Sequence, residues 1–329
     1  MLMQSFRILN SIRHPNGLFS ASKTSVNTGY DKSWIRDNIY TAMGFESIDP
    51  DMAVRTYHAL LDIFLKHEWK IDWAIKHRPL HAYQYIHARY HPLKLTEFWE
   101  EWGNKQNDAV GAFLFKVADL MDKGINVIRD SNDERILQKL VFYLKSIEYW
   151  HDKDNGMWEE NEEVHASSVG ACLAGLMKIS RYVDVPIELI EKGRETLNRL
   201  LPRESETKEV DMALLSLIWP YNVVTEEQRE KILANVEMRL LRNRGVIRYI
   251  DDRYYNRNGE AEWTMGLAWL AIIYKRMGNF MKHRFYIQKT MDAMNANGEL
   301  PELYFANTEK HNENSPLGWA QALYMVAVS

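Results

Sequence analysis

Apolar residues recur with the three- to four-residue period of an α-helix through most of the 329-residue sequence. The chain also has few residues that end helices, since its 16 glycines and 9 prolines are about 8% of the residues, against about 12% on average. This scarcity favours long helices over a β-sandwich with its many turns. We expect helices over residues 36–47, 51–67, 78–88, 105–123, 132–149, 164–182, 186–201, 208–219, 225–241, 262–276, 279–296 and 315–327.

Several of these helices have recognisable starts. Asp49, Ser131 and Thr225 stand before acidic first turns, where cap residues are typically found. Only residues 245–251 look extended, and no Gly/Pro/Ser-rich linker or solenoid-type repeat divides the chain. We therefore expect an all-α fold, one domain over residues 1–329, in which about twelve helices pair into a closed ring so that each buries its apolar stripe.

Charge and hydropathy exclude several classes of protein. The chain has 41 Lys and Arg against 45 Asp and Glu, and the basic residues are dispersed, so we expect no nucleic-acid partner. No run approaches the ~18 apolar residues of a membrane helix, and the N-terminal sequence MLMQSFRILNSIRHPNG makes a poor signal peptide. These features predict a cytoplasmic protein without a membrane span, whereas no pattern indicates its oligomeric state.

Potential metal and cofactor motifs are weak. Cys172 is the only cysteine and falls inside an expected helix, where it is a small apolar core residue. The pairs His77/His81 and His87/His91 have the i,i+4 spacing that can hold a metal on one helix face, but no HExxH motif or further ligand cluster accompanies them. Glycine-rich phosphate-binding loops are absent. We expect neither a metal nor a cofactor.

The chain is rich in aromatic residues, with 11 tryptophans and 17 tyrosines. Part of them must fill the core, but several stand beside carboxylates, amides or arginine in expected loops. A sugar ring has an apolar face that stacks on an aromatic ring and a rim of hydroxyls that bond to polar side chains. Loops of this mixed composition indicate a carbohydrate site.

Two such clusters open expected helices. Residues 29–38 read Gly-Tyr-Asp-Lys-Ser-Trp-Ile-Arg-Asp-Asn, in which Arg36 and Asp37 are either ligand-binding residues or an ion pair at a helix N-terminus. Residues 102–108 read Trp-Gly-Asn-Lys-Gln-Asn-Asp, in which the last two residues are also good helix caps. Residue type alone leaves both interpretations open.

Two further clusters contain glutamates. Residues 155–161 read Asn-Gly-Met-Trp-Glu-Glu-Asn, and residues 298–303 read Gly-Glu-Leu-Pro-Glu-Leu. Adjacent Glu159 and Glu160 beside an indole are either a solvated turn or a general acid whose pKa is raised by apolar burial and like charge. Glu302 in its loop indicates no function by itself.

Together the clusters resemble the glucoamylase-like glycoside hydrolases of family 15, a domain type that also occurs in phosphorylase kinase regulatory subunits. The resemblance runs from about residue 15 to the C-terminus and implies an (α/α)6 barrel, in agreement with the expected helix count. Five motifs follow the family's order: WxRD at 34–37, W-G-x-x-Q-x-D at 102–108, W-E at 158–159, an arginine and aromatic segment at 248–263, and L-P-E…P-L-x-W at 300–319.

The resemblance implies a role for each motif. Glu159 matches the family's general acid and Glu302 its catalytic base, which predicts an exo-acting, inverting α-glucosidase acting on an oligosaccharide or polysaccharide. Inversion requires the two carboxyls to lie roughly 6.5–9.5 Å apart. The sugar-binding residues that the resemblance implies are Trp34, Arg36, Asp37, Trp102, Gln106, Asp108, Trp158, Glu160, Arg248, Tyr254 and Trp263.

Three alternatives accompany this interpretation. Glu260 and Glu262 have the right residue type for the base, and rank behind Glu302 because they precede the penultimate helix pair rather than the last helix. The domain could bind an oligosaccharide without hydrolysing it, as a regulatory module. The motifs also do not separate α-1,4-glucans, α-1,6-linked dextrans and trehalose as substrates.

Overall fold

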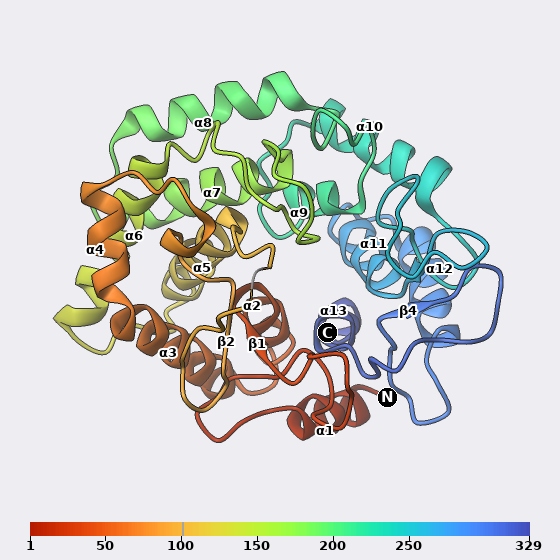
Figure 1. Cartoon of the computed structure of the whole chain (residues 1–329). Helices are drawn as coiled ribbons and strands as arrows, with labels where there is room; N and C mark the ends of the chain where they lie inside the picture. Colours follow the sequence, from red (N-terminus) through yellow and green to blue (C-terminus); the bar gives the residue numbers. More distant parts are fainter. Residues whose placement is uncertain (101) are drawn as a thin grey trace.

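The computed structural model describes residues 1–100 and 102–329, and its helices form a ring. Within these residues α2 contacts α5, α5 contacts α7, and the contacts continue through α9, α11 and α13 back to α2. Figure 1 shows these helices around the centre of the molecule. The inner helices are α2 (Ile35–Met43), α5 (Asn107–Asp122), α7 (Ala166–Ile179), α9 (Leu215–Ile218), α11 (Met265–Arg276) and α13 (Gly318–Val328).

A second set of helices covers the outside of this ring (Figure 1). Outer helices pack on inner ones, for example α8 on α7 and α12 on α11, whereas α4 packs mainly on the outer helix α6. The expected (α/α)6 barrel is confirmed. The amide of Gln321 in α13 bonds to Ser5 of α1 at 2.7 Å, which joins the two ends of the chain. The outer helices are α1 (Leu2–Ser11), α3 (Pro50–Lys66), α4 (Glu68–Lys76), α6 (Ser131–Ile147), α8 (Ile187–Leu200), α10 (Glu226–Asn235) and α12 (Phe280–Asp292).

Short elements complete the described structure. β1 (Ser33–Trp34) pairs with β2 (Arg89–Tyr90), and β3 (Glu262–Trp263) pairs with β4 (Leu303–Tyr304), both antiparallel. No helix among the described residues has both the length and the apolarity to cross a membrane. The remaining helical turns are η1 (Ala82–Gln84), η2 (Met212–Leu214) and η3 (Val236–Leu240).

Of the three predicted N-cap residues, Asp49 and Thr225 cap their helices and Ser131 does not. The Asp49 side chain accepts a bond from the backbone N–H of Met52, and Thr225 forms a capping box with Gln228. The N-cap of α6 is Asp130 rather than Ser131, because Ser131 is already the first residue of the helix. Carboxylates and hydroxyls satisfy otherwise unpaired N–H groups at these positions.

Three local predictions are wrong. Residues 78–88 are not an α-helix and contain only η1, because Pro79 disfavours helical backbone at the preceding residue. The helices α1 and α4 were not expected; α4 is short, with Ile71 and Ala74 as its buried apolar residues. The segment 245–251 forms isolated bridges, such as Val246 with Trp263, and not a strand.

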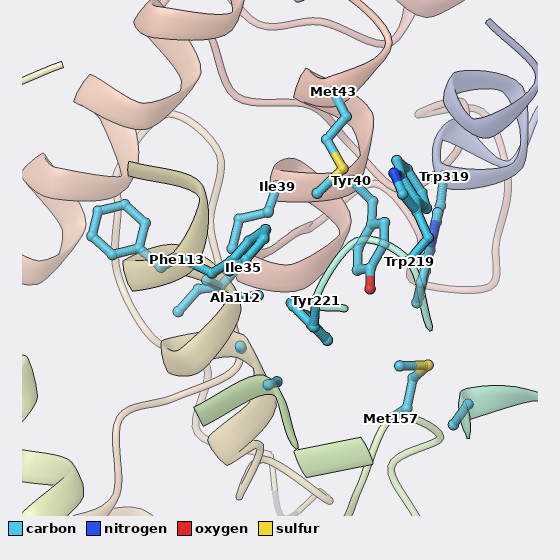
Figure 2. Packing of buried hydrophobic residues seen from close by; sticks show 14 of the residues in the cluster. Ile35, Ile39, Tyr40, Met43, Ala112, Phe113, Met157, Trp219, Tyr221 and Trp319 are labelled. Carbon is cyan, nitrogen blue, oxygen red and sulfur yellow. The ribbon is translucent and has the colours of Figure 1, made fainter. Parts of the chain in front are cut away.

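Aromatic rings fill the centre of the ring of helices. Tyr40 of α2 stacks on Trp319 of α13, with ring centroids 4.4 Å apart, and the Trp269 ring of α11 lies 5.7 Å from that of Trp319. Figure 2 shows Tyr40, Trp219, Tyr221 and Trp319 gathered beside α2. This cluster gives a rigid base to the helix ends above it.

The inner helices α5 and α7 meet backbone to backbone through glycine. A Cβ added at Gly111 would lie 2.4 Å from the backbone nitrogen of Cys172, and one added at Gly175 would lie 2.4 Å from the carbonyl oxygen of Gly111. Only glycine permits so close an approach. The contact fixes the spacing of the two helices whose N-terminal ends carry part of the site described below.

We expect Gly111→Ala to lower the free energy of unfolding by about 2 kcal/mol, because the added Cβ would meet backbone atoms of Ala171 and Cys172 and the overpacking cost is then at the upper end of its range. Overpacking typically costs about 1–3 kcal/mol, and it opposes the gain of about 1 kcal/mol in helix propensity. Urea unfolding followed by circular dichroism measures the difference. Glu195→Ala on the exposed face of α8 is the control, and a Gly111→Ala protein as stable as this control contradicts the packing argument.

Candidate active site

A single pocket collects the sequence motifs at one end of the helix ring. It is lined by residues from the starts of α2, α11 and α13 and from the loops that precede α5, α7 and α11. Helix N-termini carry partial positive charge and free N–H groups, which suits polar and anionic groups. The lining residues are Ala21, Tyr30, Trp34, Arg36, Asp37, Trp102, Met157, Trp158, Glu159, Glu160, Arg248, Tyr254, Trp263, Met265, Leu317 and Trp319.

Arg36 ties three segments of the site together. Its guanidinium is only 2% exposed, and one terminal nitrogen donates to both carboxylate oxygens of Asp108, at 2.9 and 3.0 Å. The other donates to the carbonyl oxygen of Met157 at 2.6 Å and lies 3.7 Å from Glu159. A buried charge needs such partners, so Arg36 fixes the start of α2 against α5 and against the loop that carries Glu159.

The loop containing Glu159 is also held by the 102–108 segment. Asn155 exchanges hydrogen bonds with Lys105 at 2.7 and 3.0 Å and donates to the carbonyl oxygen of Glu160 at 2.6 Å. A Cβ at Gly103 would lie 2.7 Å from the carbonyl oxygen of Glu159. Glu159 itself has a φ of +64°, which is uncommon for a side-chain-bearing residue and concentrates at functional sites.

Glu159 has the electrostatics of a proton donor. Its side chain remains 23% exposed, toward the pocket. Burial raises the pKa of Glu159 from 4.5 to about 8, and the nearby Asp37 adds to the rise while Arg36 opposes it. The carboxyl is therefore protonated at neutral pH.

Asp37 lies in the first turn of α2 and lines the same pocket. Burial raises its pKa from 3.8 to about 6, with Glu302 adding to the rise and Arg36 opposing it. The charge of Asp37 raises the pKa of Glu159, and the charge of Glu302 raises that of Asp37. At neutral pH it is a carboxylate that can accept hydrogen bonds from hydroxyls.

Glu160, unlike Glu159, accepts hydrogen bonds from two cationic side chains and a tyrosine hydroxyl. It accepts from Lys208 at 2.8 Å, from Arg248 at 2.7 Å and from the Tyr249 hydroxyl at 2.6 Å. Burial raises the pKa of Glu160, but the Arg248 and Lys208 charges outweigh it and hold the pKa below its usual value. Adjacent glutamates thus have opposite protonation states at neutral pH.

Arg248 is enclosed by ring faces and carboxylates. It forms two 2.7 Å bonds with Asp252, and its guanidinium carbon lies 4.9 Å from the Tyr254 ring centre and 5.0 Å from that of Trp263. Cation–π contacts of this kind fix the arginine in place. The expected sugar-binding residues Arg248, Tyr254 and Trp263 therefore form one wall of the pocket.

Two tryptophan pairs form the other walls. Trp34 and Trp102 meet edge to face with ring centres 5.8 Å apart, and Trp158 lies 5.7 Å from Trp263. The Trp158 indole N–H donates to Asp211 at 2.8 Å, which fixes its orientation. These rings give the pocket apolar faces among its carboxylates and arginines.

Glu302 lies just behind the pocket wall. It is 0% exposed, and it accepts hydrogen bonds from the Tyr30 hydroxyl at 2.5 Å, from Asn314 at 2.7 Å and from Asn312. Burial raises the pKa of Glu302, and the three hydrogen bonds oppose that rise. The Tyr30 and Tyr254 hydroxyls, 3.3 Å apart, separate this carboxylate from the pocket space.

The other sequence candidates lie outside the pocket lining. Gln106 donates to the carbonyl oxygen of Gly103 at 3.0 Å, and buried Asp108 reaches the pocket through Arg36. Glu262 accepts from the backbone N–H of Arg244 at 2.6 Å, and Glu260 from that of Asp251 at 3.1 Å. Gln106 and Asp108 thus hold neighbouring parts of the site in place. Glu260 and Glu262, the alternative candidates for the base, accept hydrogen bonds from backbone N–H groups outside the pocket.

The structure adds residues that the motifs did not reveal. Tyr30, Asn312 and Asn314 contact Glu302; Tyr30 is distant from it in sequence, and the two asparagines lie 10 and 12 residues after it in a loop without helical spacing. Tyr30 did fall within the first cluster, four residues before Trp34, which was the one available signal. Met157, Leu317 and Trp319 complete the pocket floor.

The histidine pairs do not form the helix face that their spacing suggested. His77 ends α4, and His81, His87 and His91 lie outside α-helices. Among the described residues no group of three or more His, Cys, Asp or Glu side chains is arranged to hold a metal ion.

Comparisons with known proteins agree with this fold. The chain is 24% identical to the probable phosphorylase b kinase regulatory subunit alpha of Caenorhabditis elegans, over 89% of this chain and 30% of that protein. The chain thus spans about 30% of the length of the curated relatives it matches.

Solved structures with the same fold include sugar complexes. A variant glycosidase in complex with glucose superposes with a TM-score of 0.86 at 18% identity, covering 99% of this chain and 95% of that one. A bacterial glucoamylase in complex with acarbose gives a TM-score of 0.73 at 16% identity, covering 98% of this chain and 54% of that one. A family model for glycosyl hydrolases of family 15 matches residues 2–328, and the chain belongs to that family.

Proposed function

We propose that the chain is one catalytic domain, an exo-acting, inverting α-glucosidase that releases glucose from the nonreducing end of an α-glucan or α-glucoside. The observation that carries this proposal is a carboxyl, Glu159, with its pKa raised to about 8 inside a pocket walled by aromatic rings. A protonated acid facing a sugar-sized, mixed aromatic and polar site is what glycosidic bond cleavage needs.

Glu159 is the proposed general acid. It transfers its proton to the glycosidic oxygen as the bond from that oxygen to the anomeric carbon breaks, so the departing sugar leaves as a neutral alcohol. The anomeric carbon gains oxocarbenium character in the transition state. The negative charges of Asp37 and Glu302 suit this positive charge, and Arg36 anchors the loop from which the acid acts.

Glu302 is the proposed base. It takes one proton from a water molecule as the water oxygen bonds to the anomeric carbon on the face opposite the leaving group, which yields β-glucose. Tyr30, Asn312 and Asn314 support this role, because three donated hydrogen bonds favour the ionised carboxylate. Neither Glu260 nor Glu262 has a comparable position, since neither lines the pocket or contacts a residue of its wall through its side chain.

The remaining polar residues hold the sugar. Asp37 accepts bonds from hydroxyls of the terminal glucose, and Arg248 with Glu160 presents a paired charge on the opposite wall. Trp34, Trp102 and the other indoles exclude water and offer stacking faces. The solved complexes of similar fold with glucose and with acarbose support a sugar ligand.

A regulatory binding domain is the second candidate. The curated relatives are named as regulatory subunits of phosphorylase b kinase, and this chain corresponds to about 30% of their length. Such a domain would bind an oligosaccharide in the same pocket without releasing glucose. The presence of both Glu159 and Glu302, with different hydrogen-bond environments, favours hydrolysis.

The two candidates are separated by incubating the protein with maltose, isomaltose and trehalose and following the anomer of released glucose by NMR. We expect β-glucose from at least one substrate. Glu159→Gln should lower that rate by about 10²–10⁴-fold, the typical contribution of general acid–base catalysis, while acarbose binding persists. A protein that binds acarbose but releases no glucose from this panel or from longer glucans supports the regulatory domain instead.

Glu162→Gln is a matched control for this variant. Glu162 is an exposed glutamate of the same loop, paired only with Lys105 at 3.1 Å, and it does not line the pocket. Its activity should equal that of the wild type. If Glu159→Gln keeps more than about half of the activity, a loss far below that expected for a general acid, Glu159 is not the acid.

The pH dependence follows from the raised pKa of Glu159. Only the protonated acid is active, so kcat/KM should fall as the pH rises through about 8, in proportion to the proton concentration. An ordinary glutamate would place this loss near pH 4.5. Initial rates on the preferred substrate from pH 4 to pH 10 measure this decrease in kcat/KM. A decrease centred below about pH 6 contradicts a buried, protonated Glu159.

The base is tested by chemical rescue. Glu302→Ala should be inactive toward glucosides, yet azide should restore turnover and give β-glucosyl azide, because an anion needs no base to attack the anomeric carbon. The control is Glu313→Ala, an exposed neighbour with normal activity expected. Rescue absent in Glu302→Ala but present in Glu260→Ala or Glu262→Ala would move the base to that residue.

A further inference from the structure

A second concave surface adjoins the pocket on the side of α4. Between the end of α4 at Lys76 and the start of α5 at Asn107 the chain makes a long connection, and its described residues, 77–100 and 102–106, contain only η1 and β2 as regular elements. Connections of this length without regular structure are uncommon and are often functional. This connection, with residues of α3 and α4, lines a groove that we call the outer groove.

The outer groove exposes large aromatic side chains. Trp69 is 67% exposed, Tyr83 is 71% exposed and Trp99 is 102% exposed, and all three line the groove. Tryptophan and tyrosine at such exposure lose the burial energy that normally keeps them inside. Their gathering in one concave surface indicates a site at which another molecule covers them.

The polar groups among these rings are held in place. Lys70 pairs with Glu97 at 2.8 Å, and the carboxylate of Glu100 pairs with Arg89 at 2.5 Å. The His81 ring lies parallel to Tyr83 with centres 5.6 Å apart. Alternation of fixed hydrogen-bonding groups with flat ring faces suits a ligand that has hydroxyl rims and apolar ring faces.

Trp102 connects the outer groove to the pocket. Its side chain lines both, packing against Trp34 on the pocket side and against His87 on the groove side, with ring centres 5.8 and 6.4 Å apart. The Arg89 guanidinium lies 4.2 Å from the Trp102 ring centre and fixes that ring. Trp102 is thus the side chain that the pocket and the outer groove share.

We propose that the outer groove binds the leaving-group part of a glucan chain, with sugar rings on Trp99, Tyr83 and Trp69. The proposal rests on the proposed function, because it takes the pocket to hold the nonreducing-end glucose. It makes a chain of several sugar units the preferred substrate, since a disaccharide such as trehalose or maltose could be hydrolysed in the pocket but would leave the groove empty. Longer chains should then be preferred over maltose.

Continuity with the pocket distinguishes this surface from the other exposed apolar patch. Phe280, Met281 and Phe285 of α12 are also exposed, but α12 lies across the ring from α4 (Figure 1) and does not line the pocket. Nothing adjoining that patch indicates its partner. The same residues provide a matched control for removing exposed aromatic rings.

The test compares maltose with maltoheptaose, and isomaltose with an isomaltooligosaccharide of similar length, in the double variant Trp69→Ala/Trp99→Ala. We expect kcat/KM for the long substrate to fall about tenfold, the effect of losing two ring contacts, with the disaccharide rate unchanged. The control, Phe280→Ala/Phe285→Ala, should match the wild type on both. The substituted side chains are exposed, so folding is not at risk.

The affinities for maltoheptaose and for the isomaltooligosaccharide, measured by calorimetry, test the groove assignment independently of hydrolysis. If the wild type hydrolyses nothing but the double variant binds the long chain more weakly than the wild type, with unchanged binding of acarbose, the groove assignment holds and the hydrolase assignment fails. Equal handling of long chains by variant and wild type overturns the groove assignment. So does a change in oligomeric state alone, which would assign the groove to a second copy of the chain.

Discussion

The buried Arg36 guanidinium is the interaction on which the site depends. It comes from the start of α2, and its partners come from α5 and from the loop before α7, segments brought together only by closing the helix ring. A guanidinium with 2% exposure is stable only when its donors are paired. The fold and the site therefore share one constraint: the ring must close correctly for Arg36 to be satisfied, and satisfying Arg36 places the Glu159 loop.

The same architecture gives the two glutamates different environments. Glu159 faces the pocket near apolar rings, with Arg36 at 3.7 Å as its ion-pair contact, and it holds its proton to about pH 8. Glu302 is more deeply buried but receives three hydrogen bonds. Burial disfavours charge in both, but Glu302 receives three hydrogen bonds that favour its charged form, whereas the Gln106 side chain is the one hydrogen-bond partner among the main influences on the pKa of Glu159. Separate environments for two carboxyls are how one site can supply both an acid and a base at one pH.

Sequence reasoning predicted the ring of helices and the motifs around the pocket because both depend on local patterns. Helical periodicity reports burial, and clusters such as Trp34–Asp37 stand at helix starts. It failed for residues 78–88, because Tyr85, Ile86 and Ala88 are buried from a connection that follows Pro79 and not from one face of a helix. It also missed Asn312 and Asn314, because an asparagine in a loop gains meaning only from the carboxylate that folding brings to it. Gln106 and Asp108 do not line the pocket themselves but interact with Glu159 and Arg36, which do, and sequence spacing alone could not show this difference.

Whether such a pocket hydrolyses or only binds depends on how water reaches Glu302. An ionised carboxylate offers about four lone-pair positions; Asn312 and Asn314 bond to one oxygen and Tyr30 to the other. Tyr30 thus bonds to one carboxylate oxygen of Glu302, and its hydroxyl lies 3.3 Å from that of Tyr254, which also lines the pocket. An inverting hydrolase needs a water molecule between its base and the sugar. The two tyrosines are therefore the side chains that decide whether Glu302 can act on a water molecule in the pocket, and so whether the proposed base can function.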